Sequence, residues 1–194
     1  MLSTRLSVLR PRQVMKRYGK NLEKLAQAIK QKTATDNEIA RITGRPSERG
    51  HTAEYIAARI FNITLLESAS HKGADGHFGG GNLMGKTVNI KWYGKQEGLL
   101  DINPEALPDF YLVMTGPKAG AVSSRGATRP WLISYVYLFN AAGLIVALRR
   151  RGVKIGIATS IQRELWEAAE IYPTQRNSQL ILSDEQRSQL ILFG

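Results

Sequence analysis

Three side chains between positions 73 and 95 are the ones in this sequence best suited to chemistry. Asp75 stands in Gly73-Ala-Asp75-Gly-His, and a glycine-rich turn leads from there into Thr87-Val-Asn89-Ile-Lys91-Trp-Tyr. Side chains alternate between the two faces of a strand, so Asn89 and Lys91 should share one face, which Asp75 can reach across a hairpin. A carboxylate, an amide oxygen and an ammonium group that meet at one point suit metal-assisted cleavage of a phosphodiester bond. The pattern predicts a nuclease.

The elements around this hairpin predict an α/β domain with a mixed central sheet flanked by helices. A helix that Ser47 caps and that runs through Thr52 to about residue 61 should bury Ala53, Ile56, Ala57 and Ile60. The apolar tail from Leu180 should dock on the core. The other expected elements are strands at 63–67, 110–115 and 131–137, a helix at 140–151, a short edge piece at 155–158, and a helix from 159 to about 171, capped by Thr159 or Ser160.

Positive charge is concentrated in the N-terminal part of the chain. Residues 1–50 contain 12 Lys and Arg against 4 Asp and Glu, whereas residues 51–194 contain 15 against 12. We expect a basic helical segment at 1–46 and an α/β domain at 47–194. The segment should hold one helix at 18–30 and a second that the capping box Thr35-Asp-Asn-Glu38 opens. These two helices form either a helix-turn-helix-like element or a brace for the domain.

The composition narrows the class of protein. The net charge is +11, which attracts nucleic acid, although a merely solubilising surface is the alternative. Cysteine is absent, which excludes disulfides, thiolate zinc sites and a cysteine nucleophile. No secretory signal and no membrane span are recognisable. We therefore expect a soluble cytoplasmic protein that does not bind a membrane.

Four segments, taken in order, resemble the PD-(D/E)xK restriction-endonuclease-like family. They are Gly50-His-Thr-Ala-Glu54-Tyr-Ile-Ala-Ala, Gly73-Ala-Asp75, Asn89-Ile-Lys91 and Pro108-Asp109-Phe-Tyr-Leu-Val, and together they cover roughly residues 48–140. The resemblance implies a restriction-endonuclease-like core and Mg²⁺-dependent cleavage of duplex DNA, with Mn²⁺ able to substitute. It also implies a homodimer and, for a restriction-modification role, a DNA methyltransferase encoded separately.

The resemblance assigns a role to each candidate. Asp75 would be the principal Mg²⁺ ligand, and Lys91 would lie near the attacking water and the scissile phosphate. Glu54, on the preceding helix, would be a second ligand or an acid beside the metal. The family has its second acid two residues before the lysine, where this chain has Asn89. An amide oxygen ligates a cation without adding charge, so either Glu54 compensates or the protein binds DNA without cutting it. We favour compensation.

Five residues are expected to contact nucleic acid: Arg41, Arg45, Lys72, Lys95 and Gln96. Simpler interpretations stand beside the catalytic ones. Asp75 can be an Asx-turn residue, Lys91 can extend to solvent, and Glu54 can be an exposed helix residue. Histidines at 71 and 77 flank Asp75, but a glycine turn gives them no fixed ligand geometry.

A phosphate-loop pattern is also present. Gly80-Gly-Asn-Leu-Met-Gly85-Lys86-Thr87 matches Gly-x4-Gly-Lys-Thr in letters. A phosphate loop requires a buried strand before it and a helix after it. Here the residues that follow Thr87 alternate with the period of a strand. We therefore expect a hairpin turn, and an NTP-binding protein is the less favoured hypothesis.

Overall fold

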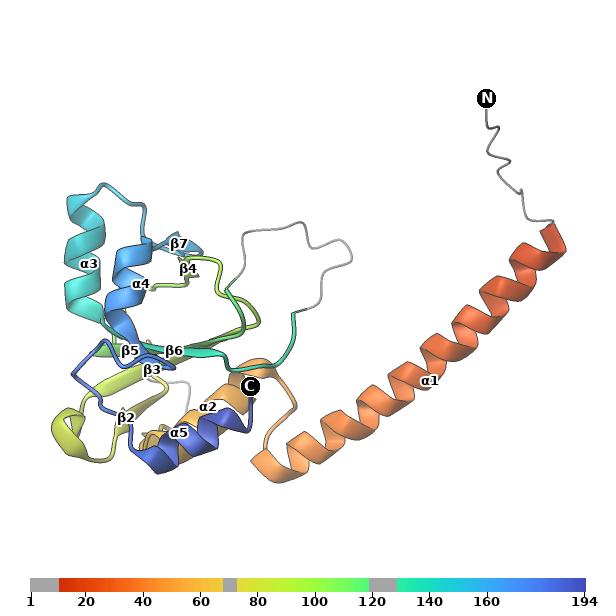
Figure 1. Ribbon diagram of the computed structural model, residues 1–194, viewed down its shortest axis with the longest axis horizontal. Helices are drawn as coiled ribbons and strands as arrows, with labels where there is room; N and C mark the ends of the chain where they lie inside the picture. Colours follow the sequence, from red (N-terminus) through yellow and green to blue (C-terminus); the bar gives the residue numbers. More distant parts are fainter. Residues whose placement is uncertain (1–10, 68–72, 119–128) are drawn as a thin grey trace. The chain divides into compact units, whose positions relative to one another are not determined.

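The chain divides into two compact units, Met1–Ser47 and Glu48–Gly194. A computed structural model describes residues 11–67, 73–118 and 129–194 (Figure 1). The described part of the first unit is dominated by a single helix, α1 (Pro11–Thr43). All other helices and strands belong to the second unit.

Helix α1 is continuous where two short helices were predicted. The capping-box prediction was wrong, because the Thr35 hydroxyl donates to the carbonyl of Gln31, 3.1 Å away, one turn back in the same helix. Threonine can satisfy its hydroxyl in this way inside a helix, so its presence does not require a helix start. An ion pair between Lys32 and Asp36, 2.6 Å long, spans the same region. The chain therefore forms no helix-turn-helix-like element here.

Helix α1 ends directly before a glycine. Gly44 has a φ of +70°, and its N–H donates to the carbonyl of Ala40. A glycine in the left-handed region commonly terminates a helix, since it carries no Cβ to clash. The predicted Ser47 cap for the next helix was wrong, because the Ser47 hydroxyl donates to Asp36 at 3.2 Å.

The second unit is built on a six-stranded mixed sheet with the order β1-β2-β3-β5-β6-β8. Only β3 and β5 run parallel; the other neighbours are antiparallel. A two-stranded ribbon, β4 with β7, lies apart from this sheet. The strands are β1 (Ile63–Leu65), β2 (Gly76–Phe78), β3 (Thr87–Tyr93), β4 (Leu99–Leu100), β5 (Phe110–Thr115), β6 (Tyr135–Asn140), β7 (Thr159–Ser160) and β8 (Glu170–Tyr172).

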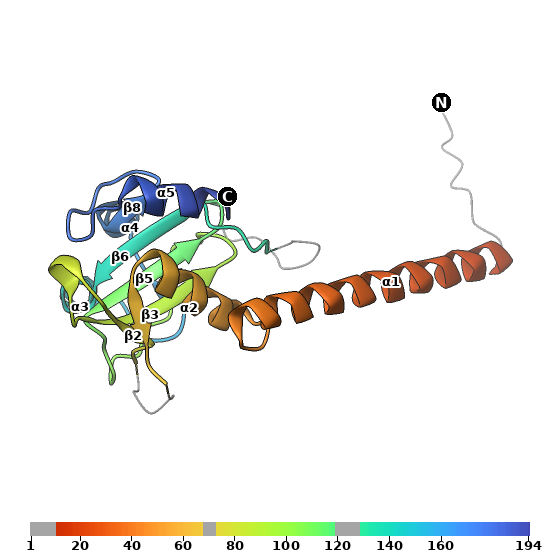
Figure 2. The ribbon, with the colours of Figure 1, turned by 90° about the horizontal axis from the view of Figure 1, so that it is seen from below.

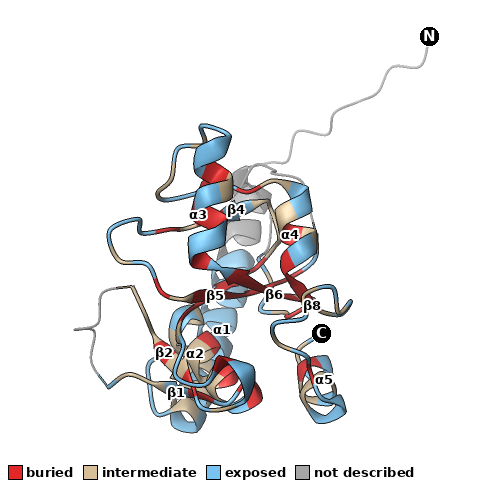
Figure 3. Ribbon diagram, turned by 90° about the vertical axis from the view of Figure 1, so that its left-hand side faces the viewer, coloured by how far each residue is buried: buried red, intermediate tan, exposed pale blue. Residues whose placement is uncertain are grey.

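Helices cover both faces of this sheet, which confirms the predicted α/β class. Helices α2 (Arg49–Ile60) and α5 (Asp184–Ile191) lie on one face, and α3 (Ala141–Arg150) and α4 (Arg163–Ala169) on the other (Figures 1 and 2). Two apolar clusters fill the spaces between these layers. In Figure 3 the buried residues concentrate in the strands and in the helix sides that face them.

The alternation of β3 decides which cluster each of its side chains joins. Val88, Ile90 and Trp92 belong to the cluster on the α2 side, together with the four predicted apolar residues of α2. Asn89 and Lys91 lie opposite Tyr111 and Val113 of β5, which belong to the cluster on the α3 and α4 side. Asn89 and Lys91 therefore share a face, as predicted.

The C-terminal half differs most from the prediction. Strand β6 begins at Tyr135 and not at Trp131, and residues 155–158 form no strand. Thr159 and Ser160 belong to β7 and do not cap a helix; Gln162 occupies the N-cap of α4. The predicted helix to residue 171 ends at Ala169, where the chain continues into β8. The apolar tail docks as predicted, with Leu182 and Leu190 buried.

The glycine-rich segment is a hairpin connection that contains a short 3₁₀ turn, Gly81–Leu83. Strand β3 follows it, as predicted, so a helix N-terminus aimed at phosphate is missing from this described region. The Asp109 carboxylate accepts hydrogen bonds from both the N–H and the hydroxyl of Thr87, at 2.8 and 2.9 Å. Lys86 pairs with the other oxygen of Asp109 at 3.3 Å. The two polar side chains of the phosphate-loop pattern thus fasten the start of β3 to the start of β5.

This link predicts an acid-dependent loss of stability. The backbone N–H of Thr87, with its hydroxyl and Lys86, lowers the pKa of Asp109 below its ordinary 3.8. A lowered folded-state pKa stabilises the protein above the unfolded-state pKa, and this contribution is lost as the pH falls through the folded-state pKa. Asp109→Asn should therefore cost about 0.5–1 kcal/mol at pH 7, a small value because the side chain is partly exposed. Urea unfolding measures this effect: the difference in unfolding free energy between the parent chain and Asp109→Asn should be smaller at pH 3 than at pH 5. An equal difference at both pH values would contradict a lowered pKa of Asp109.

Candidate functional site

Asp75 is held between two strands, directly before β2. Its carboxylate Oδ2 accepts a hydrogen bond from the N–H of Ile90 at 2.6 Å. Its own N–H donates to the carbonyl of Val88 at 2.9 Å, and its carbonyl accepts from Leu66 at 3.0 Å. The carboxylate therefore satisfies a backbone donor of β3 at the residue that separates Asn89 from Lys91. These bonds fix the orientation of the carboxylate.

Gly73 allows the segment before β2 to approach the loop that leads into β5. Its φ is +91°, and a Cβ at this position would lie 1.9 Å from the carbonyl oxygen of Ala106. Any other residue would meet both the steric clash and the strained backbone. The glycine of Gly73-Ala-Asp75 thus sets the path of the chain into the candidate site.

Asn89 is 8% exposed, and its side-chain oxygen Oδ1 is buried with no hydrogen-bond partner among the described residues. Such unsatisfied groups are few in folded proteins, and a bound ion or water is one common explanation. Lys91, two residues on, is half-buried and makes no hydrogen bond or ion pair with the part of the chain that the structure describes. A buried acceptor and an unpaired cation therefore lie on one face of β3, beside the residue that Asp75 binds.

Glu54 comes from a different layer. It lies on α2, whose buried residues pack on the face of β3 that carries Val88 and Ile90. Asn89 and Lys91 point toward the opposite face. The structure thus brings Asp75, Asn89 and Lys91 to one stretch of β3, and it places Glu54 on the helix that covers the other side of the sheet.

The residues expected to contact nucleic acid are spread over both units. Lys95 and Gln96 follow the end of β3, and the N–H of Gln96 donates to Pro117. In the first unit, Arg41 pairs with Glu38 on α1 at 2.6 Å, and Arg45 follows the end of this helix. Lys72 lies outside the described residues, as does the histidine at 71. The other flanking histidine, His77, is on β2 opposite Thr64 and Thr87.

The donor set suits a hard cation that keeps water ligands. In the ranges that the structure describes, no group of three or more His, Asp or Glu side chains is placed to hold a metal ion. The oxygen donors of the candidate residues are the Asp75 carboxylate and the amide oxygen of Asn89, which has no hydrogen-bond partner among the described residues. Mg²⁺ typically uses one or two carboxylates and completes its shell with water and phosphate oxygens. The oxygen atoms of these two residues are of the chemical type that Mg²⁺ accepts as ligands.

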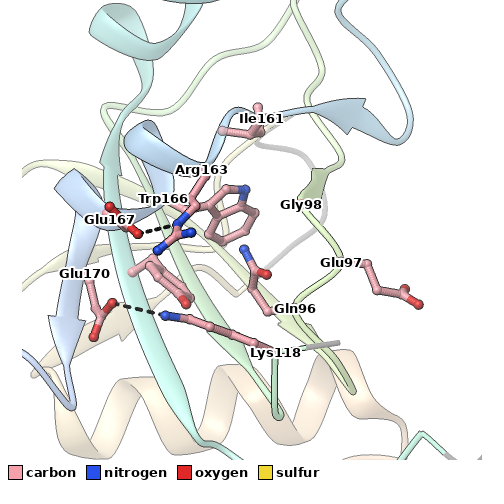
Figure 4. Close-up of a pocket in the computed structure, with 10 residues that line it drawn as sticks. Gln96, Glu97, Gly98, Lys118, Ile161, Arg163, Trp166, Glu167 and Glu170 are labelled. Carbon is pink, nitrogen blue, oxygen red and sulfur yellow. Dashed lines mark hydrogen bonds and ion pairs between the residues drawn. The ribbon is translucent and has the colours of Figure 1, made fainter. Parts of the chain in front are cut away.

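A cavity of about 520 Å³ lies elsewhere in the second unit, and the sequence interpretation missed it (Figure 4). Its walls come from segments that are far apart in sequence: 96–98 after β3, Lys118 after β5, Tyr137 on β6, and residues 161–170. Gln96, which was expected to contact the DNA backbone, contributes its side chain here. No local motif marks this cavity, since only the strand order brings its walls together. The available signal was the close spacing of Trp166, Glu167 and Glu170 in the sequence.

Comparison of this chain with protein-family models and with curated proteins finds no match. None of the helices in the described ranges is both long enough and apolar enough to cross a membrane.

Proposed function

We propose that this protein is a Mg²⁺-dependent endonuclease that acts on duplex DNA, with a restriction-endonuclease-like core in its second unit. The observation that carries the proposal is the buried, partnerless Oδ1 of Asn89. It lies next in sequence to Ile90, whose N–H fixes the Asp75 carboxylate, and on the same face as Lys91, which has no ion-pair partner in the described part of the chain. A bound cation would give the orphaned oxygen a partner, and the carboxylate that Ile90 holds nearby would supply its negative charge.

The chain's own residues have separable tasks in this proposal. Asp75 and Asn89 would hold Mg²⁺, with Mn²⁺ as a substitute, and the ion would supply Lewis-acid activation of water and neutralisation of phosphate charge. The hydrogen bond from the Ile90 N–H would orient the Asp75 carboxylate before the ion binds. Lys91 donates to a phosphate oxygen and stabilises the negative charge that develops there. Glu54, which lies on α2 over the other face of the sheet, would act only indirectly, as an acid outside the set of metal ligands.

The first unit supplies positive charge for DNA and a surface for a second copy of the chain. Residues 1–50 carry a net +8, obtained as 12 minus 4, which favours association with phosphates. Leu22, Leu25 and Ile29 are exposed on α1 at coiled-coil spacing. We infer a homodimer through this stripe, which would let two sites cut both strands. A monomeric mass in analytical ultracentrifugation at micromolar concentration would contradict the dimer.

A plasmid assay tests the proposal directly. Supercoiled DNA is incubated with the full chain and Mg²⁺ or Mn²⁺, and parallel samples contain EDTA. Nicked or linear products should form only with the added metal. An absence of products with either ion, on methylated and unmethylated DNA and across a range of salt, would refute nuclease activity. A restriction-modification role further predicts a cognate methyltransferase that protects the host DNA.

A second candidate is a DNA-binding protein that keeps this fold without cleavage. Asn89 favours it, because the amide contributes no charge to attract a cation and Asp75 belongs to no group of three His, Asp or Glu side chains within the described ranges. Binding should then be independent of Mg²⁺ and should weaken steeply with salt. Gel-shift affinities with and without EDTA, measured beside the plasmid assay, distinguish the two candidates.

A further inference from the structure

The cavity near α4 has the construction of a small-molecule site. It lies at the carboxyl ends of β3 and β5, where residues 96–98 and Lys118 leave the parallel pair of strands. Helix α4 and β8 supply the remaining wall (Figure 4). Its volume of about 520 Å³ is within the range of pockets that hold metabolite-sized ligands. It uses none of Asp75, Asn89 or Lys91.

The carboxylates of this cavity already have cationic partners. Glu170, which is 2% exposed, pairs with Lys118 at 3.7 Å and accepts from the N–H of Thr174 at 3.2 Å. Glu167 accepts from Arg163 at 2.6 Å, and both pairs are visible in Figure 4. Glu97 pairs with Arg129 at 3.2 Å. The acidic side chains therefore need no further cation.

The unused hydrogen-bonding capacity belongs to donors. The Tyr137 hydroxyl and the Trp166 indole N–H are both buried without a partner in the described structure, on residues that are 0% and 3% exposed. Burial, reinforced by the charge of Glu170, raises the pKa of Tyr137, so this hydroxyl keeps its proton and can donate. Lys118 and Arg163 each carry further N–H groups beyond their single ion pairs.

We infer that this cavity binds a small molecule bearing an oxyanion, either an organic phosphate or a carboxylate, through Tyr137, Trp166 and Lys118. An indole N–H can only donate, so its partner must be an acceptor. A charged oxygen is the strongest acceptor for such donors in a desolvated site. The walls carry three carboxylates and two cations, and the partner of Glu97, Arg129, lies outside the lining, so an anion would have to be held by the buried donors together with Lys118. The inference does not depend on DNA cleavage.

Indole N–H signals in a ¹H–¹⁵N correlation spectrum of the full chain test this site. Three tryptophans give three signals, and Trp166→Phe identifies the one from the cavity. The probes are inorganic phosphate, a nucleoside monophosphate and a small dicarboxylate, added in separate titrations. The Trp166 signal should move downfield with at least one probe, because its N–H gains an acceptor. The Trp92 signal should stay in place, because its N–H already donates to Leu132 at 3.0 Å.

Removal of one hydroxyl provides the matched comparison. Tyr137→Phe should lower the affinity for the active probe about 10-fold or more and change thermal stability little, since among the described residues the hydroxyl has no hydrogen bond of good geometry and only Thr115 acts on its pKa as a side-chain partner. Tyr93→Phe is the control: its hydroxyl bonds to Asp101 at 3.1 and 3.3 Å, so stability should fall while probe affinity stays constant. The inference fails if no probe moves the Trp166 signal, or if Tyr137→Phe binds the active probe as tightly as the parent chain.

Discussion

Asp75→Asn is expected to lower Mg²⁺-dependent DNA cleavage by about 100- to 1,000-fold, which is the usual cost of losing one electrostatic contributor. Asparagine keeps an oxygen that can accept from the N–H of Ile90, so the bond that holds this segment to β3 can persist. What is lost is the negative charge that would hold the cation. Initial rates of plasmid nicking at several Mg²⁺ concentrations measure the effect, and circular dichroism verifies the fold.

Another aspartate in the same unit provides the control for this substitution. Asp101 accepts hydrogen bonds from the N–H of Ala158 at 2.7 Å and from the Tyr93 hydroxyl, which is a structural task. Asp101→Asn should therefore reduce stability and leave cleavage near the parent rate. Lys91→Met should act like Asp75→Asn, while Lys86→Met, which breaks only the ion pair with Asp109, should not. Parent-like cleavage by either Asp75→Asn or Lys91→Met would remove that residue from the mechanism.

Asn89→Asp is expected to tighten Mg²⁺ binding about 30-fold. A unit charge attracts another by about 1 kcal/mol at 4 Å even in bulk water, hence about 2 kcal/mol for a divalent ion. Without metal the same substitution should destabilise the protein, because it places a carboxylate where the parent side chain is only 8% exposed. Added Mg²⁺ should then restore the melting temperature. Thermal melts across a Mg²⁺ series give this result whether or not the protein cleaves DNA.

The pattern of rescue separates the two proposed functions. A Mg²⁺-rescued melting temperature with increased nicking supports an endonuclease whose metal site is limited by its charge. Rescue without nicking supports the DNA-binding alternative. Destabilisation that Mg²⁺ does not relieve would contradict a cation site at Asn89, and Leu65→Asn on β1, a partly buried position in the same sheet, controls for nonspecific effects of a polar substitution.

Apolar spacing, alternation and turn residues correctly predicted those helices and strands whose form depends mainly on neighbouring residues in the sequence. The apolar spacing of residues 53, 56, 57 and 60 identified the buried side of α2, and the alternation after Thr87 identified β3 and the common face of Asn89 and Lys91. Strand β5 was placed at its observed limits between Pro108 and Gly116. The hairpin before β3 followed from its glycines, and it explains why Thr87 begins a strand and not a helix.

Local signals failed where competing local structures differ little in free energy. Thr35 can cap a helix or donate back within one, and only the continuous α1 shows that it does the latter. The sequence of residues 159 to about 171 predicts one capped helix, yet pairing of β7 with β4 and of β8 with β6 takes both ends of that stretch into strands. Long-range pairing decides such cases, because a strand gains its hydrogen bonds from residues distant in sequence.

The sequence by itself determined an α/β chain with a basic N-terminal part, and it singled out Asp75, Asn89 and Lys91 through their spacing. Tertiary structure alone decided three further points: that the Asp75 carboxylate binds the backbone of Ile90, that Glu54 lies on the helix over the other face, and that four separate segments enclose a cavity around Tyr137 and Trp166. Periodicity specifies which face a side chain takes, because it depends on backbone geometry within one element. Neighbours across the sheet depend on strand order and register, which the chain fixes only when its buried surfaces pack together.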